Sequence, residues 1–285
     1  MPWEGPQMAE LPEVETLRRQ LERDVVGRKV KTVDVHDTKV IPRHSTKKQF
    51  AEMLEGAKLK SLIRRGTFLI FTLDTGDRLI VRPGLGGQLR KTASKDDLAD
   101  GTAVVISFTQ GGQLRYIDPR RTGELWILTP EQVAEGVDEI ELLGYDVVDQ
   151  PVPWADFAKL VLQRSVKLKT LLTDEDLLTG IGNVYSDEIL YDAGLRYDRL
   201  SDSLSVQEVR RLYRSVVEIL HDAIKHGGTT LADDGWHDLH GDVGGYTDHH
   251  QVHARDGEPC RRCRDVISKA KFGGKTTWFC EQCQT

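Results

Sequence analysis

The residues with the clearest chemistry are four cysteines near the C-terminal end of the sequence. They form two Cys-x-x-Cys pairs, Cys260 with Cys263 and Cys280 with Cys283, separated by 16 residues. Four thiolates at this spacing can surround one tetrahedral Zn²⁺ ion. Two disulfides would use the same side chains, but a reducing cytoplasm disfavours them. We therefore predict one structural zinc ion held by these four cysteines.

The residues between the two pairs predict a short hairpin. Val266-Ile267 and Thr276–Phe279 are its expected strands. A hairpin of this length is not stable alone, and structural zinc contributes roughly 10–16 kcal/mol to the folding of such modules. Its expected role is to hold Lys275 and the neighbouring basic residues in fixed positions.

Charge is distributed unevenly along the sequence. The net charge of -6 is unfavourable for a nucleic-acid-binding protein, which needs clustered Lys and Arg. Residues 255–275, however, carry seven basic and three acidic side chains, whereas residues 226–250 carry five Asp and no Lys or Arg. This segregation fits a protein with one face for a polyanion, although a solvated charged surface would have the same composition.

The first half of the sequence is predicted to be rich in β-strands. Alternating apolar residues and Gly-containing turns mark two hairpins and a further strand. The expected strands cover Val30–Val35, Phe68–Leu73, Leu79–Val81, Val104–Phe108 and Leu114–Ile117. Val14, Leu17 and Leu21 recur at helical spacing within Glu13–Arg23. These patterns predict a β-sandwich with a flanking N-terminal helix.

The second half is predicted to be helical from Trp154 to about Lys225. An apolar stripe marks its last helix, at Val209, Leu212, Val216, Ile219 and Leu220. Leu178–Tyr185 is a glycine-broken turn between two helices, and a Gly-rich loop follows from Gly227 to His250. The whole pattern predicts an α+β multidomain fold divided at residues 1–150, 151–250 and 251–285.

Several ordered segments resemble the formamidopyrimidine-DNA glycosylase/endonuclease VIII family. The resemblance covers nearly the whole sequence from Ala9 to Thr285. Its segments are Glu10–Thr16, Asp118–Arg121, Gly180–Tyr185, Gly227–Thr230, Val252–Cys260 and the four-cysteine tail. It implies an N-terminal β-sandwich, a helix–two-turns–helix domain with a lesion loop, and a zinc hairpin, with DNA held in the cleft between them.

The resemblance implies a protein that binds double-stranded DNA containing damaged bases or abasic sites and flips the damaged nucleotide out of the stack. Asn183 is then a phosphate contact, because backbone N–H groups at a helix start bind anions. A helix cap is the ordinary alternative for Asn. Arg120, Lys169 and Lys275 are further DNA-binding candidates, for which a plain surface role stays open.

Members of the family typically attack the sugar C1′ with the amine of an N-terminal proline, and the following Glu is the acid/base. The matching residues are Ala9 and Glu10. If Met8 is the first residue and is removed, Ala9 carries a primary amine with an ordinary pKa of about 7.7–8.0, which can form a Schiff base. If Met1 is the first residue, the Ala9 nitrogen is an amide. Pro2 would then be the terminal amine, and we do not expect it to reach the site.

Other positions also depart from the family pattern. Thr67 replaces a lysine that contacts phosphate and assists strand cleavage, and Lys275 replaces an arginine. Leu85 replaces a methionine that fills the void left by the flipped base, and Thr122 replaces an aromatic wedge. His253-Ala254 replaces Tyr-Gly. Together these changes suggest altered lesion recognition, reduced lyase activity or loss of catalysis.

Three functional hypotheses follow. We favour a DNA glycosylase, with or without abasic-site lyase activity, that removes oxidised or ring-opened bases through Ala9 and Glu10. A non-catalytic damaged-DNA-binding protein of the same fold is the alternative. In a third hypothesis, Glu10 activates water in a monofunctional glycosylase.

The acidic loop from Asp233 to His250 occupies the position of the family's lesion loop. A second metal is conceivable at five histidines, but we expect these to be surface residues of a mobile loop: His237, His240, His249, His250 and His253. Because the sequence lacks a secretory signal and an apolar run of 18 residues, we expect a cytoplasmic location, no membrane contact and a monomer.

Overall fold

The computed structural model describes residues 8–150, 152–231 and 235–285 of the chain. Within these ranges the chain divides into two compact units. The β unit comprises residues up to Glu141 together with Gly227–Gly244, and the helical unit comprises Leu142–His226 and Gly245–Thr285. The three-part division at residues 150 and 250 stays a prediction. No helix in the described ranges is both long and apolar enough to cross a membrane.

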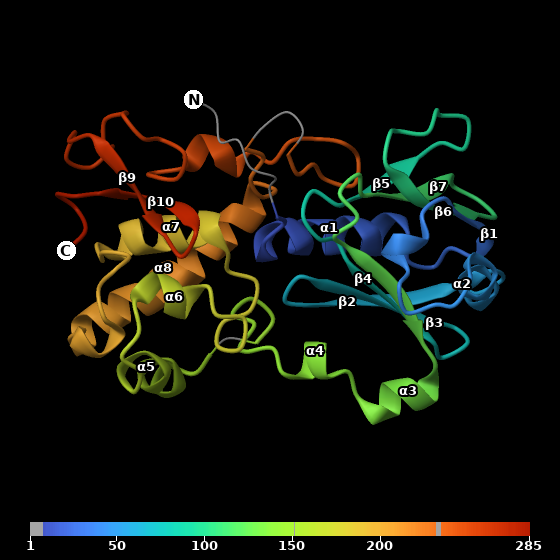
Figure 1. The fold of residues 1–285 in the computed structure, drawn as a ribbon, viewed down its shortest axis with the longest axis horizontal. Coiled ribbons are helices and arrows are strands. Elements are labelled where there is room, and N and C mark those ends of the chain that lie inside the picture. The colour runs from blue at the N-terminus through green and yellow to red at the C-terminus, as the bar shows by residue number, and fades with distance from the viewer. Residues whose placement is uncertain (1–7, 151, 232–234) are drawn as a thin grey trace. The chain divides into compact units, whose positions relative to one another are not determined.

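The β unit contains two four-stranded antiparallel sheets (Figure 1). Five of these eight strands lie where the sequence predicts strands, and the other three were not predicted. The first has the order β1-β6-β7-β5 and the second the order β2-β3-β4-β8. The strands are β1 (Val30–Val35), β2 (Leu59–Arg65), β3 (Phe68–Leu73), β4 (Arg78–Arg82), β5 (Gln88–Thr92), β6 (Thr102–Phe108), β7 (Gln113–Ile117) and β8 (Glu124–Leu128). Short helices accompany them: η1 (Thr38–Val40), α2 (Lys47–Leu54), α3 (Pro130–Glu135) and α4 (Asp138–Glu141).

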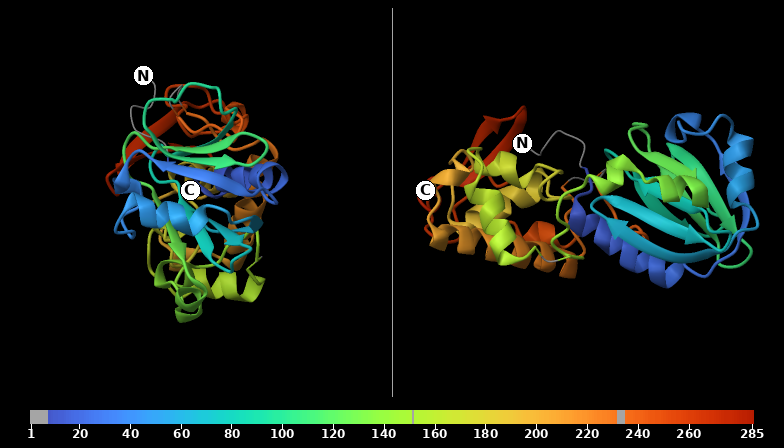
Figure 2. Two further views of the ribbon diagram at one scale, coloured as in Figure 1. Left: turned by 90° about the vertical axis from the view of Figure 1, so that its right-hand side faces the viewer. Right: turned by 90° about the horizontal axis from the view of Figure 1, so that it is seen from below.

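Described residues of the β unit form an apolar core to which both sheets and α1 (Leu11–Asp24) contribute, and the ribbons of these elements are drawn in Figure 2. Both sheets contribute to it, for example through Phe71 and Val104, and α1 contributes Val14, Leu17 and Leu21. The predicted sandwich with a flanking N-terminal helix is therefore confirmed.

The segment Gly227–Gly244 is anchored to this core by two apolar side chains. Trp236 and Leu239 are fully buried in the core of the β unit. The Leu239 N–H and carbonyl are also hydrogen-bonded, to the Gln20 side chain and the Lys91 N–H. Asp233, the expected start of the lesion loop, lies outside the described residues.

The helical unit is built around two adjacent helices, α7 (Asn183–Ala193) and α8 (Val206–Lys225). The predicted stripe on α8 is confirmed at its buried positions, and Ile219 is half-buried. The other elements are α5 (Trp154–Leu162), α6 (Leu168–Leu172), η2 (Ser201–Ser203), η3 (Tyr246–His249), β9 (Ile267–Phe272) and β10 (Lys275–Cys280).

The predicted C-terminal hairpin is confirmed as β9 and β10, which pair antiparallel from Ile267 opposite Cys280 to Phe272 opposite Lys275. The hairpin has a small core of its own. Tyr191 of α7, Val252, Ile267 and Trp278 pack there with the cysteines. The α+β fold with a sandwich, a helical part and a zinc-type hairpin is thus as the sequence predicts.

Candidate functional site

Ala9 and Glu10 lie at the start of α1, in the β unit, and both are buried. Glu10 is the N-cap residue of the helix. Its side chain accepts a hydrogen bond from the Glu13 N–H, and Glu13 Oε2 accepts one from the Glu10 N–H at 2.9 Å. This capping box satisfies backbone donors that a helix start leaves unpaired. The first turn of α1 therefore holds the two predicted catalytic residues in a defined position.

Glu13 also fixes the Gly227–Thr230 motif against the same helix. Its Oε1 accepts a hydrogen bond from the Thr229 N–H at 2.7 Å. A Cβ atom on Gly228 would lie 2.7 Å from that oxygen, and Gly228 has a φ of +81°, so glycine is required there on both counts. The role of Glu13 was not predicted from the sequence. A carboxylate three residues after a helix N-cap is typical of a capping box, so the sequence pattern could have indicated it.

A buried ion pair joins α1 to the β2–β3 hairpin. Arg64 donates from Nε to Glu15 Oε2 at 3.0 Å and from a terminal nitrogen to the Gly66 carbonyl at 3.0 Å. Burial raises the pKa of Glu15, but hydrogen bonds from Arg18, Arg19 and Arg64 outweigh it and lower the pKa to about 2. The turn that carries half-buried Thr67 is thus tied to the helix that carries Glu10.

Leu85 and Thr122, two of the positions that depart from the family pattern, are neighbours in the β unit. The Leu85 N–H donates to Thr122 Oγ1 at 2.7 Å. Thr122 is exposed, as is Arg120, whose side chain lies next to Gly86. Leu85 and Thr122, which depart from the family pattern, and Arg120, a predicted DNA contact, therefore occupy adjoining loops.

Asp118 organises the loop that carries Arg120. One of its carboxylate oxygens accepts hydrogen bonds from the Arg120 and Arg121 N–H groups, and the other accepts one from the Gly123 N–H at 2.8 Å. An Asp that bonds the backbone just ahead of it is a common way to fix a turn. Asp118 therefore positions the loop, a role that its place in the Asp118–Arg121 motif does not by itself predict.

The helical unit brings Lys169, Asn183 and the strand of Lys275 together. Asn183 begins α7, and its Nδ2 donates to the Thr276 carbonyl at 2.9 Å. Lys169 Nζ donates to the Asn183 carbonyl at 3.3 Å. Lys275 precedes Thr276 and is exposed. Lys169 differs from the expected surface cation, because its side chain is 4% exposed and forms an ion pair with Asp187.

Asp187 is the fully buried centre of this cluster. Besides Lys169, it accepts hydrogen bonds from Thr277 Oγ1, from the Trp278 N–H at 3.3 Å and from His253 Nδ1 at 2.9 Å. Burial raises the pKa of this carboxyl, but Lys169 and His253 outweigh the effect and lower it. Asp187 therefore links α6, α7 and β10, and sequence analysis missed it because its partners are distant in the sequence.

Two of the five histidines expected at the surface are buried, so that expectation is wrong for them. His250 is 2% exposed and His253 is 1% exposed. The neighbouring Glu188, also buried, accepts hydrogen bonds from the N–H groups of Gln251, Val252 and His253 at 2.8–3.0 Å. His237 is half-buried, whereas His240 and His249 are exposed as expected.

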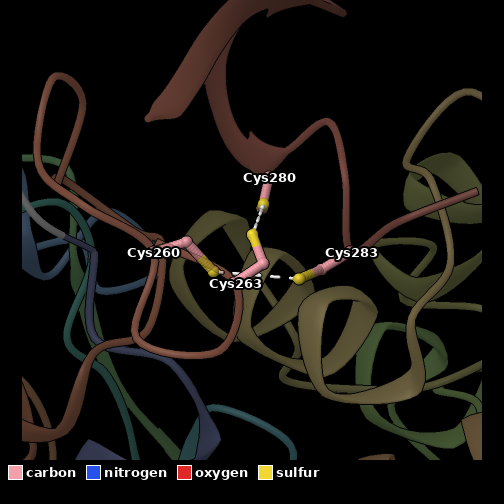
Figure 3. A group of neighbouring side chains, drawn as sticks. All are labelled: Cys260, Cys263, Cys280 and Cys283. Atoms are coloured by element: carbon pink, nitrogen blue, oxygen red, sulfur yellow. Dashed lines mark hydrogen bonds between the residues drawn. The ribbon is translucent and has the colours of Figure 1, made fainter. Parts of the chain in front are cut away.

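The four cysteines converge on one point (Figure 3), as the Cys-x-x-Cys spacing predicts. The Sγ atoms of Cys260 and Cys283 are 3.8 Å apart, and those of Cys263 and Cys280 are 3.5 Å apart. Zinc–sulfur bonds of about 2.3 Å in a tetrahedron place sulfurs about 3.8 Å apart. The donor set therefore has the size and the chemistry that zinc requires.

The surroundings of the cluster are also suited to a bound cation. The Tyr191 hydroxyl lies 3.2 Å from the Cys260 sulfur, and the Arg262 N–H donates to the same sulfur at 3.4 Å. Burial and the neighbouring cysteines raise the pKa of Cys283, and burial raises that of Cys280. Burial also raises the pKa of Cys260, but hydrogen bonds from Tyr191 and from backbone N–H groups outweigh it and lower the pKa to about 6. A divalent cation would hold four such thiolates charged together.

Three family models match the sequence. The formamidopyrimidine-DNA glycosylase N-terminal domain matches residues 8–125, and the H2TH domain of the same glycosylase matches residues 143–234. The zinc finger found in FPG and IleRS matches residues 257–285.

Whole relatives and solved structures agree with these matches. The formamidopyrimidine-DNA glycosylase of Pelotomaculum thermopropionicum is 36% identical over 97% of this chain and 99% of its own length. The crystal structure of the MutM (Fpg) protein from Thermus thermophilus has a TM-score of 0.85 at 32% identity, covering 96% of this chain and 98% of that one. Lactococcus lactis Fpg in complex with DNA containing an abasic site has a TM-score of 0.87 at 30% identity, covering 97% and 99%.

Fold, site and relatives define a zinc-finger protein of DNA repair. The chain belongs to the formamidopyrimidine-DNA glycosylase family. Its cofactor is one structural zinc ion held by the four cysteines.

Proposed function

We propose that this protein is a DNA glycosylase of base excision repair that binds double-stranded DNA with damaged bases or abasic sites and removes oxidised or ring-opened bases. Membership of the family supports the reaction class. The observation that carries the proposal is the buried Glu10 next to Ala9, held by Glu13 at the start of α1. A carboxylate in a fixed position beside the reacting nitrogen is what proton transfer at C1′ requires.

In the proposed reaction, the Ala9 amine acts once Met8 has been removed. Its nitrogen forms a bond to C1′ while the C1′–base bond breaks, and the base leaves with the bonding electron pair. Opening of the sugar ring gives the Schiff base, and Glu10 moves protons between the amine and the ring oxygen. Lyase activity would follow from the same intermediate.

Asn183, Lys275 and Arg120 contact DNA phosphates in this proposal. Lys169 acts beside them, because its ammonium donates to the Asn183 carbonyl and so fixes the Asn183 backbone. From the sequence we further propose three domains, at residues 1–150, 151–250 and 251–285. We also propose that the protein is a monomer and is cytoplasmic.

Two departures favour a second candidate, a damaged-DNA-binding protein without catalysis. Ala9 replaces the family's proline, and Thr67 replaces the lysine of the β2–β3 turn. Pro2, the other conceivable amine, lies outside the described residues. If the Ala9 nitrogen is an amide in the mature protein, the remaining route is activation of water by Glu10.

Borohydride trapping on duplex DNA distinguishes these candidates. We expect the chain that begins at Ala9 to form a covalent adduct with DNA containing an abasic site or 8-oxoguanine, and the chain extended to Met1 to form none. Glu10→Gln should retain DNA binding and lose base release. Tight, salt-dependent binding to abasic DNA with neither adduct nor base release in any form would establish the non-catalytic candidate. Base release without an adduct would favour activation of water.

A further inference from the structure

Three side chains that the proposed reaction does not use lie together, two at the C-terminal end of α8 and one at the C-terminal end of η3. Asp222 and His226 are four residues apart at the C-terminal end of α8, and His249 is the last residue of η3. Each offers one ligand atom, and these atoms all lie within 4.8 Å of one another. Among the five histidines considered in the sequence, His249 is the one in this cluster.

The two imidazole rings are already close and are held in place. Their centroids are 3.9 Å apart with an interplanar angle of 35°. The buried Tyr246 ring is stacked with the His249 ring, with 6.0 Å between the ring centroids. Its centroid is 6.3 Å from that of the His226 ring. The two rings are therefore already close to each other before an ion binds.

Backbone and carboxylate contacts also orient His226. Its Nδ1 lies 2.8 Å from the Asp222 carbonyl and 3.4 Å from the Asp222 carboxylate. A proton on Nδ1 that is shared with the carbonyl leaves the lone pair of Nε2 available, which is how histidine ligands are commonly oriented. Residues four apart share one face of a helix, so Asp222 and His226 can serve the same ion.

We propose that Asp222, His226 and His249 bind a second divalent metal ion of the zinc type. Two imidazoles and one carboxylate suit Zn²⁺, Ni²⁺ or Cu²⁺ better than Ca²⁺ or Mg²⁺. Because the three side chains are half-buried or exposed, the ion exchanges readily, unlike the zinc held by the four cysteines.

An ion at this site would link the two points at which the chain leaves and re-enters the helical unit. The segment Gly227–Gly244 leaves and rejoins the helical unit between His226 and Gly245, and the Gly245 N–H donates to the His226 carbonyl at 2.9 Å. An ion bound by His226 and His249 closes this junction with a second link. It therefore fixes both ends of the segment that carries the Gly228–Thr229 contact to Glu13.

Titration with Ni²⁺ alone tests the proposal on the full chain in its zinc-loaded form. Calorimetry should show one binding event beyond the zinc already present, and hydrogen exchange should show added protection at residues 223–226 and 245–249. His226→Ala and His249→Ala should each weaken this event at least tenfold while retaining the cysteine-bound zinc.

The matched control is His221→Ala, because His221, an exposed residue of α8, has its Nδ1 2.8 Å from a carbonyl four residues earlier, that of Val217, as His226 does with Asp222. It should bind Ni²⁺ as the unmodified chain does. Absence of the second event, or its persistence in both His226→Ala and His249→Ala, would overturn the proposal. Asp222→Asn, which keeps the shape of the side chain, should weaken binding by a smaller factor. None of these outcomes depends on glycosylase activity.

Discussion

At the scale of single residues, the departures from the family pattern are surrounded by an intact support structure. Glu13 still caps α1 and holds Thr229, and Arg64 still joins Glu15 to the hairpin turn. Thr67 occupies that turn without the cation that the family places there. The β2–β3 turn is therefore held in a fixed position relative to α1. Placing a cation at position 67 should have a measurable effect on the reaction.

Thr67→Lys should increase strand cleavage at abasic sites. The ammonium would occupy a turn that is already fixed to α1 through Arg64, so we expect an increase of roughly 10²-fold, the lower end of the range for positioned acid–base groups. Gel analysis of cleaved abasic duplex measures it. Ser61→Lys adds the same charge at an exposed position of β2 and should leave the rate unchanged. Equal effects of both variants would mean that only the added charge matters.

Glu15 should make a pH-dependent contribution to stability. Its pKa is lowered in the folded chain to about 2 from an ordinary 4.5, so its contribution is present above pH 4.5 and is lost as the pH falls toward 2. The shift corresponds to a contribution on the order of 3 kcal/mol. Urea unfolding from pH 2 to 7 should show the difference between the unmodified chain and Glu15→Gln shrinking at low pH. A difference that stays constant with pH would contradict this origin.

At the scale of elements, Asp187 is the point at which α6, α7 and β10 meet. It carries the charge that pairs with buried Lys169, and its partner Thr277 follows the residue that receives the Asn183 side chain. The position of the predicted phosphate ligand thus depends on a buried carboxylate that contacts no solvent. Stability and DNA affinity should respond together when this group is changed.

Asp187→Asn should destabilise the protein by about 3–5 kcal/mol, because it leaves the Lys169 ammonium buried without its counter-charge. DNA affinity should also fall. Asp187→Asn combined with Lys169→Met removes both charges and should recover much of the free energy of unfolding but not the affinity, since Asn183 would still lack its support. Recovery of both properties in the double variant would show that the network serves folding alone.

The features predictable from the sequence are those that depend on neighbouring residues. The strand β1 follows from period-two alternation, and β3, β4, β6 and β7 follow from apolar runs beside Gly-containing turns. The zinc site follows from the Cys-x-x-Cys spacing, whereas β2, β5 and β8 were not predicted. The burial of Lys169 and His253 was not predictable, because both contact Asp187, which lies 18 positions from Lys169 and 66 positions from His253 in the sequence. Trp236 was missed for a related reason: its segment is rich in Gly and Asp, and only tertiary contact shows that it enters the β-unit core.

At the scale of the whole molecule, the two units have different sources of stability. The β unit has a large apolar core formed from both sheets, α1 and α2. The hairpin of the helical unit has only a few apolar residues around its cysteines and depends on zinc. Loss of the metal should therefore affect the two units differently.

Cys260→Ser should abolish zinc binding and strongly reduce DNA affinity while leaving the β unit folded. Atomic absorption should report the loss of the metal, and hydrogen exchange should show lost protection at residues 260–283 with retained protection in β3 and β4. Addition of a strong chelator to the unmodified chain should reproduce both results. A variant that keeps its zinc, or that binds DNA as before without it, would refute this dependence.

A net charge of -6 makes DNA binding by this protein dependent on a few well-placed cations. Lys275 is one of them, exposed at the start of β10 next to the strand position that receives Asn183. Lys275→Ala should reduce the slope of log K against log salt concentration by about 0.9, the value for one phosphate contact, with similar weakening for intact and damaged duplexes. Lys275→Arg should keep the slope, and Lys48→Ala, which removes an exposed cation of α2, should leave it unchanged. Fluorescence anisotropy between 50 and 200 mM salt measures these slopes, and an unaltered slope in Lys275→Ala would remove this residue from the DNA interface.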